Sequence, residues 1–325
     1  MAVYTPVSFA EASHLLHGLQ LGQLQSMEGC SGGIENTNYF VTTDSGAYVL
    51  TLFERLNAEQ LPFYLRLMKH LALSGIPVPE PAADSKGALQ YLVNGKPATV
   101  VNRLRGKSEL SPQPAHCASV GAWLAKMHLA GQHFDVQQPN LRGLGWWNET
   151  VPVILPFMDI AQHSLLKGEL AYQNHVAASS VYTALPRGAI HADLFRDNVM
   201  FAPLKAGASL ERSDLEMTGF FDFYFAGVDT WVFDLGVCLN DWCVDLATGA
   251  PDAKRTRAFL DAYESVRTLE GAERKALPSM LRAAALRFWI SRLWDLHLPR
   301  QASVLTAHDP THFERVLRQR LRFAA

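Results

Sequence analysis

A short stretch near the middle of the chain, residues 189–200, carries side chains that could support phosphoryl transfer. It places His191, Asp193 and Asn198 in that order, with Asp193 and Asn198 five residues apart. Phosphoryl transfer needs a carboxylate that accepts the proton of the attacking hydroxyl, and a neutral oxygen ligand for the metal ion on the nucleotide phosphates. One tight loop with Asp193 as the base and Asn198 as the metal ligand supplies both groups. Taken alone, the pattern also fits a polar surface turn.

A second carboxylate follows at the end of an apolar strand, where Asp222 lies 24 residues after Asn198. A kinase site needs such an anionic ligand, because one carboxamide cannot neutralise a metal ion that bridges adjacent phosphates. An isolated aspartate at this place could instead cap a helix or a turn. The ordered series from His191 to Asp222 is much rarer than either part, and it favours a catalytic site.

Three further residues are predicted to have structural rather than reactive roles. Asp234 lies between aromatic and aliphatic residues in the segment 231–236. A buried carboxylate in such surroundings usually accepts hydrogen bonds from backbone N–H groups or from a basic side chain, so Asp234 is predicted to brace the catalytic loop. His191 is predicted to orient the base, and His128 to pack within an amphipathic helix.

The elements that must position these residues divide the chain into two parts. Strands with one helix are expected over the first hundred residues, and mostly helices after Gly106. The alternating and helical patterns predict strands at 38–43, 47–53, 89–93, 98–102 and 217–221, and helices at 58–73, 116–128 and 169–185, with a largely helical segment from Asp252 onward. We therefore predict a strand-rich lobe at 1–101, a linker at 102–106 and a helical lobe at 107–325.

Composition narrows the class of protein. The 325 residues are 48% hydrophobic and 18% charged, with a net charge of −2, the balance of a soluble globular protein without a basic surface for nucleic acid or anionic membrane. No apolar run approaches the roughly 18–20 residues that span a bilayer, and no secretory signal is evident. The cysteines Cys30, Cys117, Cys238 and Cys243 are scattered, which indicates reduced thiols. A cytoplasmic location is expected, and the patterns leave monomer and homodimer open.

The assembled motifs resemble the aminoglycoside phosphotransferase and choline kinase-like superfamily. Within it, the chain is most similar to the bacterial homoserine kinases of this fold. The segments that carry the resemblance are 35–41, 48–54, 75–79, 191–200, 222–224 and 239–243. It implies an α+β protein kinase-like fold of two lobes, a small antiparallel-sheet N-lobe with one main helix and a larger helical C-lobe. It further implies ATP-dependent phosphorylation of L-homoserine, a small amino alcohol, as a step towards threonine, with ATP and Mg²⁺ as cofactors.

The resemblance also implies roles for individual residues. Asp193 matches the catalytic base, grouped with His191 and Arg196, and Asn198 and Asp222 match the magnesium ligands. Nucleotide contacts are expected from a phosphate-covering loop and from the strands and helix beside it: Gly29, Ser31, Gly32, Gly33, Asn38, Thr51, Glu59 and Asn102. Substrate contacts are expected from Asn36, Arg196, Tyr224, Asp229 and Asp241. Of these, Asp229 and Asp241 are candidates for the substrate ammonium group, and Arg196 for a phosphate or a carboxylate.

The chain departs from the kinase pattern at two positions. Thr51 stands where kinases carry a phosphate-binding lysine, and Arg55 is the nearest replacement cation. Phe195 stands where protein kinases place a lysine, two residues after the base. These departures leave alternatives open: a kinase for choline, hydroxylysine, an aminoglycoside or methylthioribose, or a pseudokinase that binds nucleotide without turnover.

Overall fold

The computed structural model describes residues 5–30, 36–204, 215–298 and 308–322. The chain forms two compact units. The first comprises Met1–Arg105 together with the short segment Gly219–Phe221, and the second comprises Gly106–Thr218 and Asp222–Ala325. The division at Arg105 falls within the segment predicted as a linker, and the return of residues 219–221 to the first unit was not predicted.

The first unit is built on one antiparallel sheet of five strands. Its strands are β1 (Leu24–Gly29), β2 (Asn36–Thr43), β3 (Ala47–Phe53), β4 (Tyr91–Val93) and β5 (Lys96–Asn102), in the order β1-β2-β3-β5-β4. The predicted strands are confirmed to within a few residues at each end. Asn94 and Gly95 join β4 to β5 with φ angles of 49° and 75°, the left-handed conformation that a tight hairpin requires. The sequence pair at this turn therefore explains the register.

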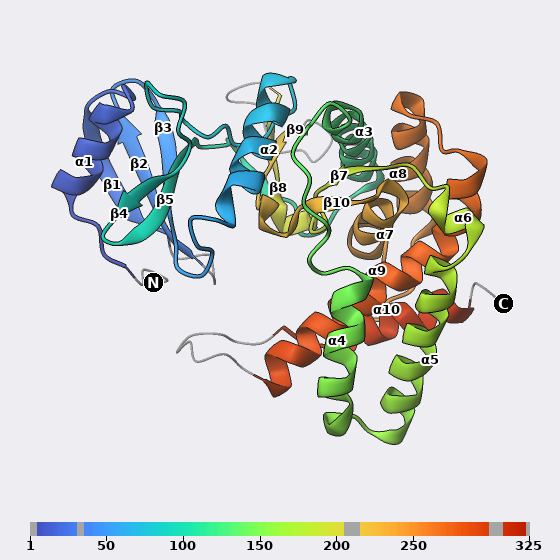
Figure 1. Cartoon of the computed structure of the whole chain (residues 1–325). Helices are drawn as coiled ribbons and strands as arrows, with labels where there is room; N and C mark the ends of the chain where they lie inside the picture. Colours follow the sequence, from blue (N-terminus) through green and yellow to red (C-terminus); the bar gives the residue numbers. More distant parts are fainter. Residues whose placement is uncertain (1–4, 31–35, 205–214, 299–307, 323–325) are drawn as a thin grey trace. The chain divides into compact units, whose positions relative to one another are not determined.

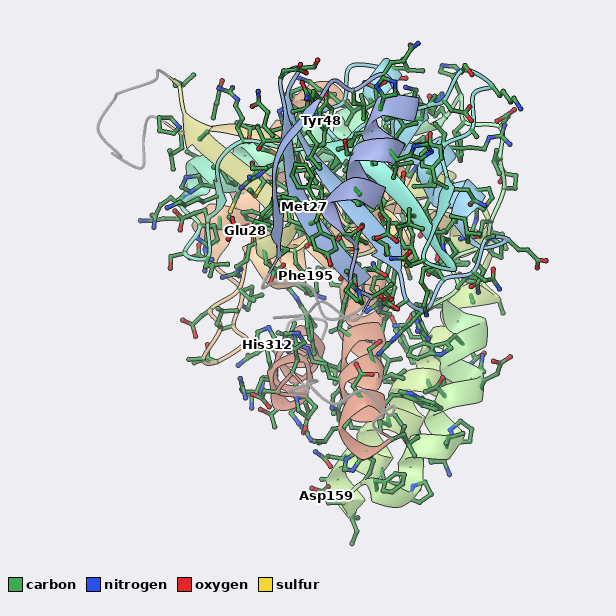
Figure 2. The ribbon with its side chains drawn as sticks, turned by 90° about the vertical axis from the view of Figure 1, so that its left-hand side faces the viewer. Met27, Glu28, Tyr48, Asp159, Phe195 and His312 are labelled. Carbon is green, nitrogen blue, oxygen red and sulfur yellow. The ribbon has the colours of Figure 1, made fainter. Side chains whose placement is uncertain are left out.

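Two helices accompany this sheet, although one was predicted. The expected helix is α2 (Leu61–Leu73). The additional helix is α1 (Phe9–Gly18), which begins at a capping box formed by Ser8 and Glu11. It packs its buried side chains on the sheet in one apolar core, next to which Met27 and Tyr48 lie (Figures 1 and 2). Its short apolar stripe of Ala12 and Leu16 explains why periodicity alone missed it.

The second unit is mainly helical. Its helices are α3 (Pro114–Gly131), α4 (Leu144–Ile154), α5 (Ile160–Ala177), α6 (Ser180–Thr183), α7 (Trp231–Trp242), α8 (Ala253–Val266), α9 (Gly271–His297) and α10 (Thr311–Arg322). Helix α3 packs along α8, α9 packs along both α7 and α10, and α4 and α5 lie side by side (Figure 1). The prediction of one helix over 169–185 is wrong, because Ser179 caps a separate helix, α6, after α5 has ended. The described helices include none with the length and apolar composition that a bilayer span demands.

A short antiparallel ribbon in this unit brings the two predicted motifs together. Strand β7 (Arg187–Ile190) pairs with β10 (Gly227–Thr230), and Ile190 is the partner of Gly227. The chain that leaves β7 therefore starts at the same end of the ribbon where the chain enters β10. The first segment carries Asp193 and the second carries Asp222. A second sheet, ordered β6-β8-β9, contains β6 (Lys107–Ser108), β8 (Val199–Pro203) and β9 (Leu215–Phe220).

Candidate active site

The catalytic loop is held at its base by one buried carboxylate. Asp234, near the start of α7, accepts hydrogen bonds from the backbone N–H groups of His191 (2.9 Å) and Ala192 (2.8 Å). Its side chain has no exposed surface. Ala192 has a φ of 63°, which a residue with a Cβ adopts only where its surroundings enforce it. The two hydrogen bonds provide that constraint one residue before Asp193, and they confirm the prediction that Asp234 braces the loop.

The same carboxylate ties the loop to helix α3. The Nε2 atom of His128 lies 3.1 Å from the Asp234 carboxylate, and its Nδ1 lies 2.8 Å from the hydroxyl of Tyr263 on α8. Burial lowers the pKa of His128 against the opposing pull of Asp234. Burial acts to raise the pKa of Asp234, but the hydrogen bond from His128 and the loop groups lower it below its ordinary value. His128 is thus packed inside the protein, as predicted, and it also links the loop to α3 and α8, which was not predicted.

This link gives folding stability a defined pH dependence. Because the pKa of His128 is depressed in the folded state, the unfolded chain binds more protons below about pH 6.5, so stability falls as the pH drops below that value. We expect His128→Gln, which keeps hydrogen-bonding atoms but does not titrate, to flatten the fall by up to about 1.4 kcal/mol per pH unit. Urea unfolding between pH 7.5 and 5.5 measures this pH dependence of the free energy of unfolding. His175→Gln, at an exposed position on α5, is the control. Parallel curves for wild type and His128→Gln would contradict the assignment.

A tight turn after Asp193 brings the amide of Asn198 back to it. The Asn198 side-chain NH₂ donates to the backbone carbonyl of Asp193 (2.9 Å), which also accepts from the Phe195 N–H (2.8 Å). From the end of α7, the indole of Trp242 donates to the Leu194 carbonyl (2.9 Å). With its NH₂ engaged in this way, the Asn198 amide has its carbonyl oxygen available as a metal ligand.

Asp222 enters this site from the other segment. It adopts a left-handed conformation (φ 69°, ψ 60°) just before the short helix η4 (Phe223–Phe225). The ring of Phe223 packs 4.5 Å from that of His191, which joins the two segments. Burial raises the pKa of Asp193 well above its usual value; the Arg287 charge opposes this, and the Asp222 charge adds to it. The two carboxylates therefore lie close enough to interact.

The donor set suits magnesium. Asn198 and Asp222 offer oxygen ligands, and Mg²⁺ is commonly held by one or two protein oxygens together with water and substrate phosphates. No larger protein cage is needed for that role. These two residues are thus the ones that would hold the ion.

Two residues predicted as separate substrate contacts instead bind each other. Arg196, in the short helix η2 (Arg196–Asn198), donates from its backbone N–H (2.8 Å) and from Nε (3.0 Å) to one carboxylate oxygen of Asp241. A second guanidinium nitrogen donates to the Asp241 backbone carbonyl, and a third to the Leu110 carbonyl (3.0 Å). Both side chains are buried. The pair offsets its own charges and fastens the loop to α7, so this geometry favours a structural role for both residues over the predicted substrate contacts.

The other substrate candidates in this unit have different surroundings. Asp229, on β10, accepts a hydrogen bond from Asn140 (2.9 Å) and lies 3.5 Å from a guanidinium nitrogen of Arg187. Its carboxylate therefore already has a cationic and an amide partner. Tyr224 lies in η4 directly after Asp222, and burial together with the Asp222 charge raises the pKa of its hydroxyl. Tyr224 is thus the predicted substrate contact nearest in sequence to a metal ligand.

Residues predicted to contact nucleotide occupy the strands of the first unit. Asn38 on β2 is the partner of Thr51 on β3, and the Thr51 hydroxyl donates to the Asn38 side chain (2.7 Å). Gly29 ends β1, and Asn36, which was predicted to contact substrate rather than nucleotide, begins β2. Thus a neutral polar pair occupies the strand position where kinases carry lysine. Ser31, Gly32 and Gly33, predicted to form the phosphate-covering loop, lie outside the described residues.

The remaining two nucleotide candidates are Glu59, which lies in the turn before α2, and Asn102, which lies at the end of β5. Glu59 was expected to open the first helix, but α2 begins at Leu61 and Glu59 is exposed in the turn before it. Its backbone N–H donates to the Asn57 side chain (3.0 Å), which stabilises that turn. Asn102 ends β5, where its side-chain oxygen accepts from the Glu80 N–H (2.6 Å).

One charged residue near the site was missed by sequence reasoning. Arg287 lies on α9 and is 3% exposed, with its guanidinium carbon 3.8 Å from the Phe288 ring centroid and 4.9 Å from that of Phe225. Burial lowers its pKa to about 10, while the Asp193 charge opposes the change, so the side chain stays protonated at neutral pH. The available signal was a single arginine within the apolar run 283–290.

Comparison with known proteins identifies the family. Residues 26–269 match the phosphotransferase enzyme family. A protein of Polaromonas naphthalenivorans named homoserine kinase is 64% identical over 321 residues, covering 99% of this chain and 98% of the relative. A protein of Ralstonia nicotianae with the same name is 56% identical, covering 99% and 96%.

Solved structures of low sequence identity share the fold. An amicoumacin kinase, solved with AMP-PNP and Ca²⁺, has a TM-score of 0.67 at 16% identity, covering 97% of this chain and 93% of its own. An ethanolamine kinase of Plasmodium vivax has a TM-score of 0.61 at 13% identity, covering 98% and 87%. These likenesses confirm the predicted α+β kinase-like fold. The chain belongs to the phosphotransferase enzyme family and is a kinase that transfers a phosphoryl group to a hydroxyl.

Proposed function

We propose that this enzyme transfers the terminal phosphoryl group of ATP to the side-chain hydroxyl of L-homoserine. The product would be O-phospho-L-homoserine, an intermediate on the way to threonine. The observation that carries this proposal is the 64% identity, over 99% of the chain, to a relative named homoserine kinase. The arrangement around Asp193 supports it, because that site contains the groups that such a reaction needs.

Different residues of the second unit would have different roles in the reaction. The Asp193 carboxylate, which accepts no hydrogen bond within the described part of the chain, would take the proton of the substrate hydroxyl. Asn198 and Asp222 would hold Mg²⁺, which when bound offsets charge on the phosphates of ATP. Asp234 fixes the backbone next to the base through two hydrogen bonds, so the base is in place before substrate arrives.

The strands of the first unit would receive the nucleotide. We place Gly29, Asn38 and Thr51 among its contacts, because backbone N–H groups and neutral polar side chains can bind phosphate oxygens without a lysine. Without a lysine at position 51, either another cation, for which Arg55 is the nearest candidate in sequence, or a larger share for magnesium would neutralise the phosphates.

A panel of acceptors tests this function. The enzyme is incubated with MgATP and either L-homoserine, choline, hydroxylysine, methylthioribose or an aminoglycoside, and ADP release is followed. We expect release that depends on L-homoserine, with one phosphoryl group gained by the amino acid in mass spectrometry. Turnover of another acceptor with homoserine inactive would assign the enzyme to that acceptor, and ATP binding without any turnover would contradict the catalytic assignment of Asp193.

A further inference from the structure

Arg287 is a buried cation that forms no ion pair with the described residues. Its Nη2 atom is buried and has no hydrogen-bond partner among the described residues. Three other arginines in the described chain are buried, and each has a side-chain acceptor: Arg196 pairs with Asp241, Arg267 with Glu273 (2.8 Å) and Arg320 with Asn240 (2.9 Å). A charged group held away from water without a partner is strongly unfavourable, so such a group usually serves a ligand.

The position of Arg287 links it to both loops of the active site. The Phe225 ring, 4.9 Å from its guanidinium carbon, lies three residues after Asp222. The Phe288 ring, 3.8 Å from it, packs 4.4 Å from that of Phe195, two residues after Asp193. Contact with two aromatic faces leaves the N–H edges of the guanidinium for a ligand in the plane of the group.

The electrostatics of this position favour an anion. A second guanidinium, that of Arg142, lies 6.0 Å from the same Phe225 ring, and its charge disfavours the protonated form of Arg287. Asp193 provides attraction but no ion pair with Arg287 within 4 Å in the part of the chain that the structure describes. A bound carboxylate would relieve the repulsion between the two arginines and would satisfy the N–H groups that have no acceptor.

We propose that Arg287 binds the α-carboxylate of the amino-acid acceptor and so selects amino acids over simple amino alcohols. This inference rests on the proposed function, because it specifies the acceptor of that same site. The phosphates are the other source of oxyanions, but the Mg²⁺ that Asn198 and Asp222 would hold would neutralise them. The acceptor carboxylate has no other proposed cation, since Arg196 is engaged by Asp241.

Steady-state kinetics of Arg287→Met test the proposal. kcat/KM is measured for L-homoserine and for L-homoserine amide, in which a neutral amide replaces the carboxylate. We expect the variant to lose about 100-fold in kcat/KM for homoserine, and less than about 3-fold for the amide, because truncating one partner removes the charge pair only where the carboxylate exists. Arg287→Lys, which keeps the charge but loses the planar fork, should recover part of the loss.

An inhibition measurement avoids dependence on slow substrates. L-2-aminobutyrate carries the carboxylate and ammonium of homoserine without its hydroxyl, and its competitive inhibition constant against homoserine should rise about 100-fold in Arg287→Met, with less effect for propylamine. Arg274→Met, the same change at an exposed position of α9, should alter neither constant. Thermal melting identifies any variant that is unfolded, and the lysine variant then carries the comparison.

The outcomes separate the two proposals. Equal losses for homoserine and its amide, or an unchanged inhibition constant, would overturn the carboxylate role and assign Arg287 to the phosphoryl group or to packing. Failure of the wild-type enzyme to phosphorylate homoserine while another acceptor reacts would instead overturn the proposed function.

Discussion

Asp193→Asn should lower kcat for the acceptor by about 100- to 10,000-fold while ATP binding persists. Asparagine has nearly the shape of aspartate but cannot accept the hydroxyl proton, and the contribution of a positioned general base lies in this range. The local backbone should survive the change, since the loop is held by hydrogen bonds to the Asp193 carbonyl and to the Asp234 carboxylate rather than to the Asp193 side chain. The expected signature is therefore an intact, nucleotide-binding enzyme that does not turn over.

Single-turnover assays measure the loss of catalysis, and thermal shifts with MgATP measure whether nucleotide binding persists. Asp261→Asn is the matched control, because Asp261 is an exposed carboxylate on α8. We expect it to change kcat by less than about 3-fold, since it removes a charge that touches no reacting group. Near-normal turnover in Asp193→Asn would remove Asp193 from the role of base. Loss of nucleotide binding in that variant would indicate a role in binding instead.

The parts of this site that sequence reasoning could predict are local ones. Asp193 and Asn198 lie within one turn of the chain, so their types and spacing already indicate a base and an amide ligand. Asp222 follows the end of a strand, and the pairing of β7 with β10 then brings it to Asp193. Asp234 was predicted as a brace because a carboxylate among apolar residues needs donors close by.

The parts that sequence reasoning missed depend on contacts between distant segments. Arg196 and Asp241 are 45 residues apart, and nothing in either local pattern shows that α7 lies against the loop. Arg287 is still farther along the chain from the catalytic loop. It lies on α9, and the sequence pattern around it indicates only burial. From sequence alone, each charged residue near the catalytic motif is therefore predicted to bind a ligand by itself, because its protein partner cannot be seen. Among the described residues, the structure shows instead which buried charges are already paired, and Arg287 is the buried arginine whose Nη2 has no hydrogen-bond partner.

Arg196→Met should lower the free energy of unfolding by about 3–5 kcal/mol, because it leaves the buried Asp241 carboxylate without its cation. Asp241→Asn should have a comparable effect, because it leaves the buried Arg196 guanidinium without its carboxylate. The double variant should be less destabilised than the sum of the two, since neither charge is then left alone. Arg318→Met breaks the exposed pair with Glu314 on α10 and should change stability by no more than about 0.5 kcal/mol. Urea unfolding of the four variants measures all these differences.

The same variants decide between support and substrate binding. If the Arg196–Asp241 pair holds the catalytic loop on α7, Arg196→Met lowers kcat and stability together, because the loop that carries Asp193 and Asn198 loses its attachment. If Arg196 instead bound the homoserine carboxylate or the ATP phosphates, its loss would raise KM for homoserine or for ATP and would leave the stability nearly unchanged. Each of the three guanidinium nitrogens of Arg196 already donates to a protein acceptor, which leaves less of the group for a ligand. We therefore expect stability to fall with kcat, and the acceptor carboxylate to depend on Arg287 alone.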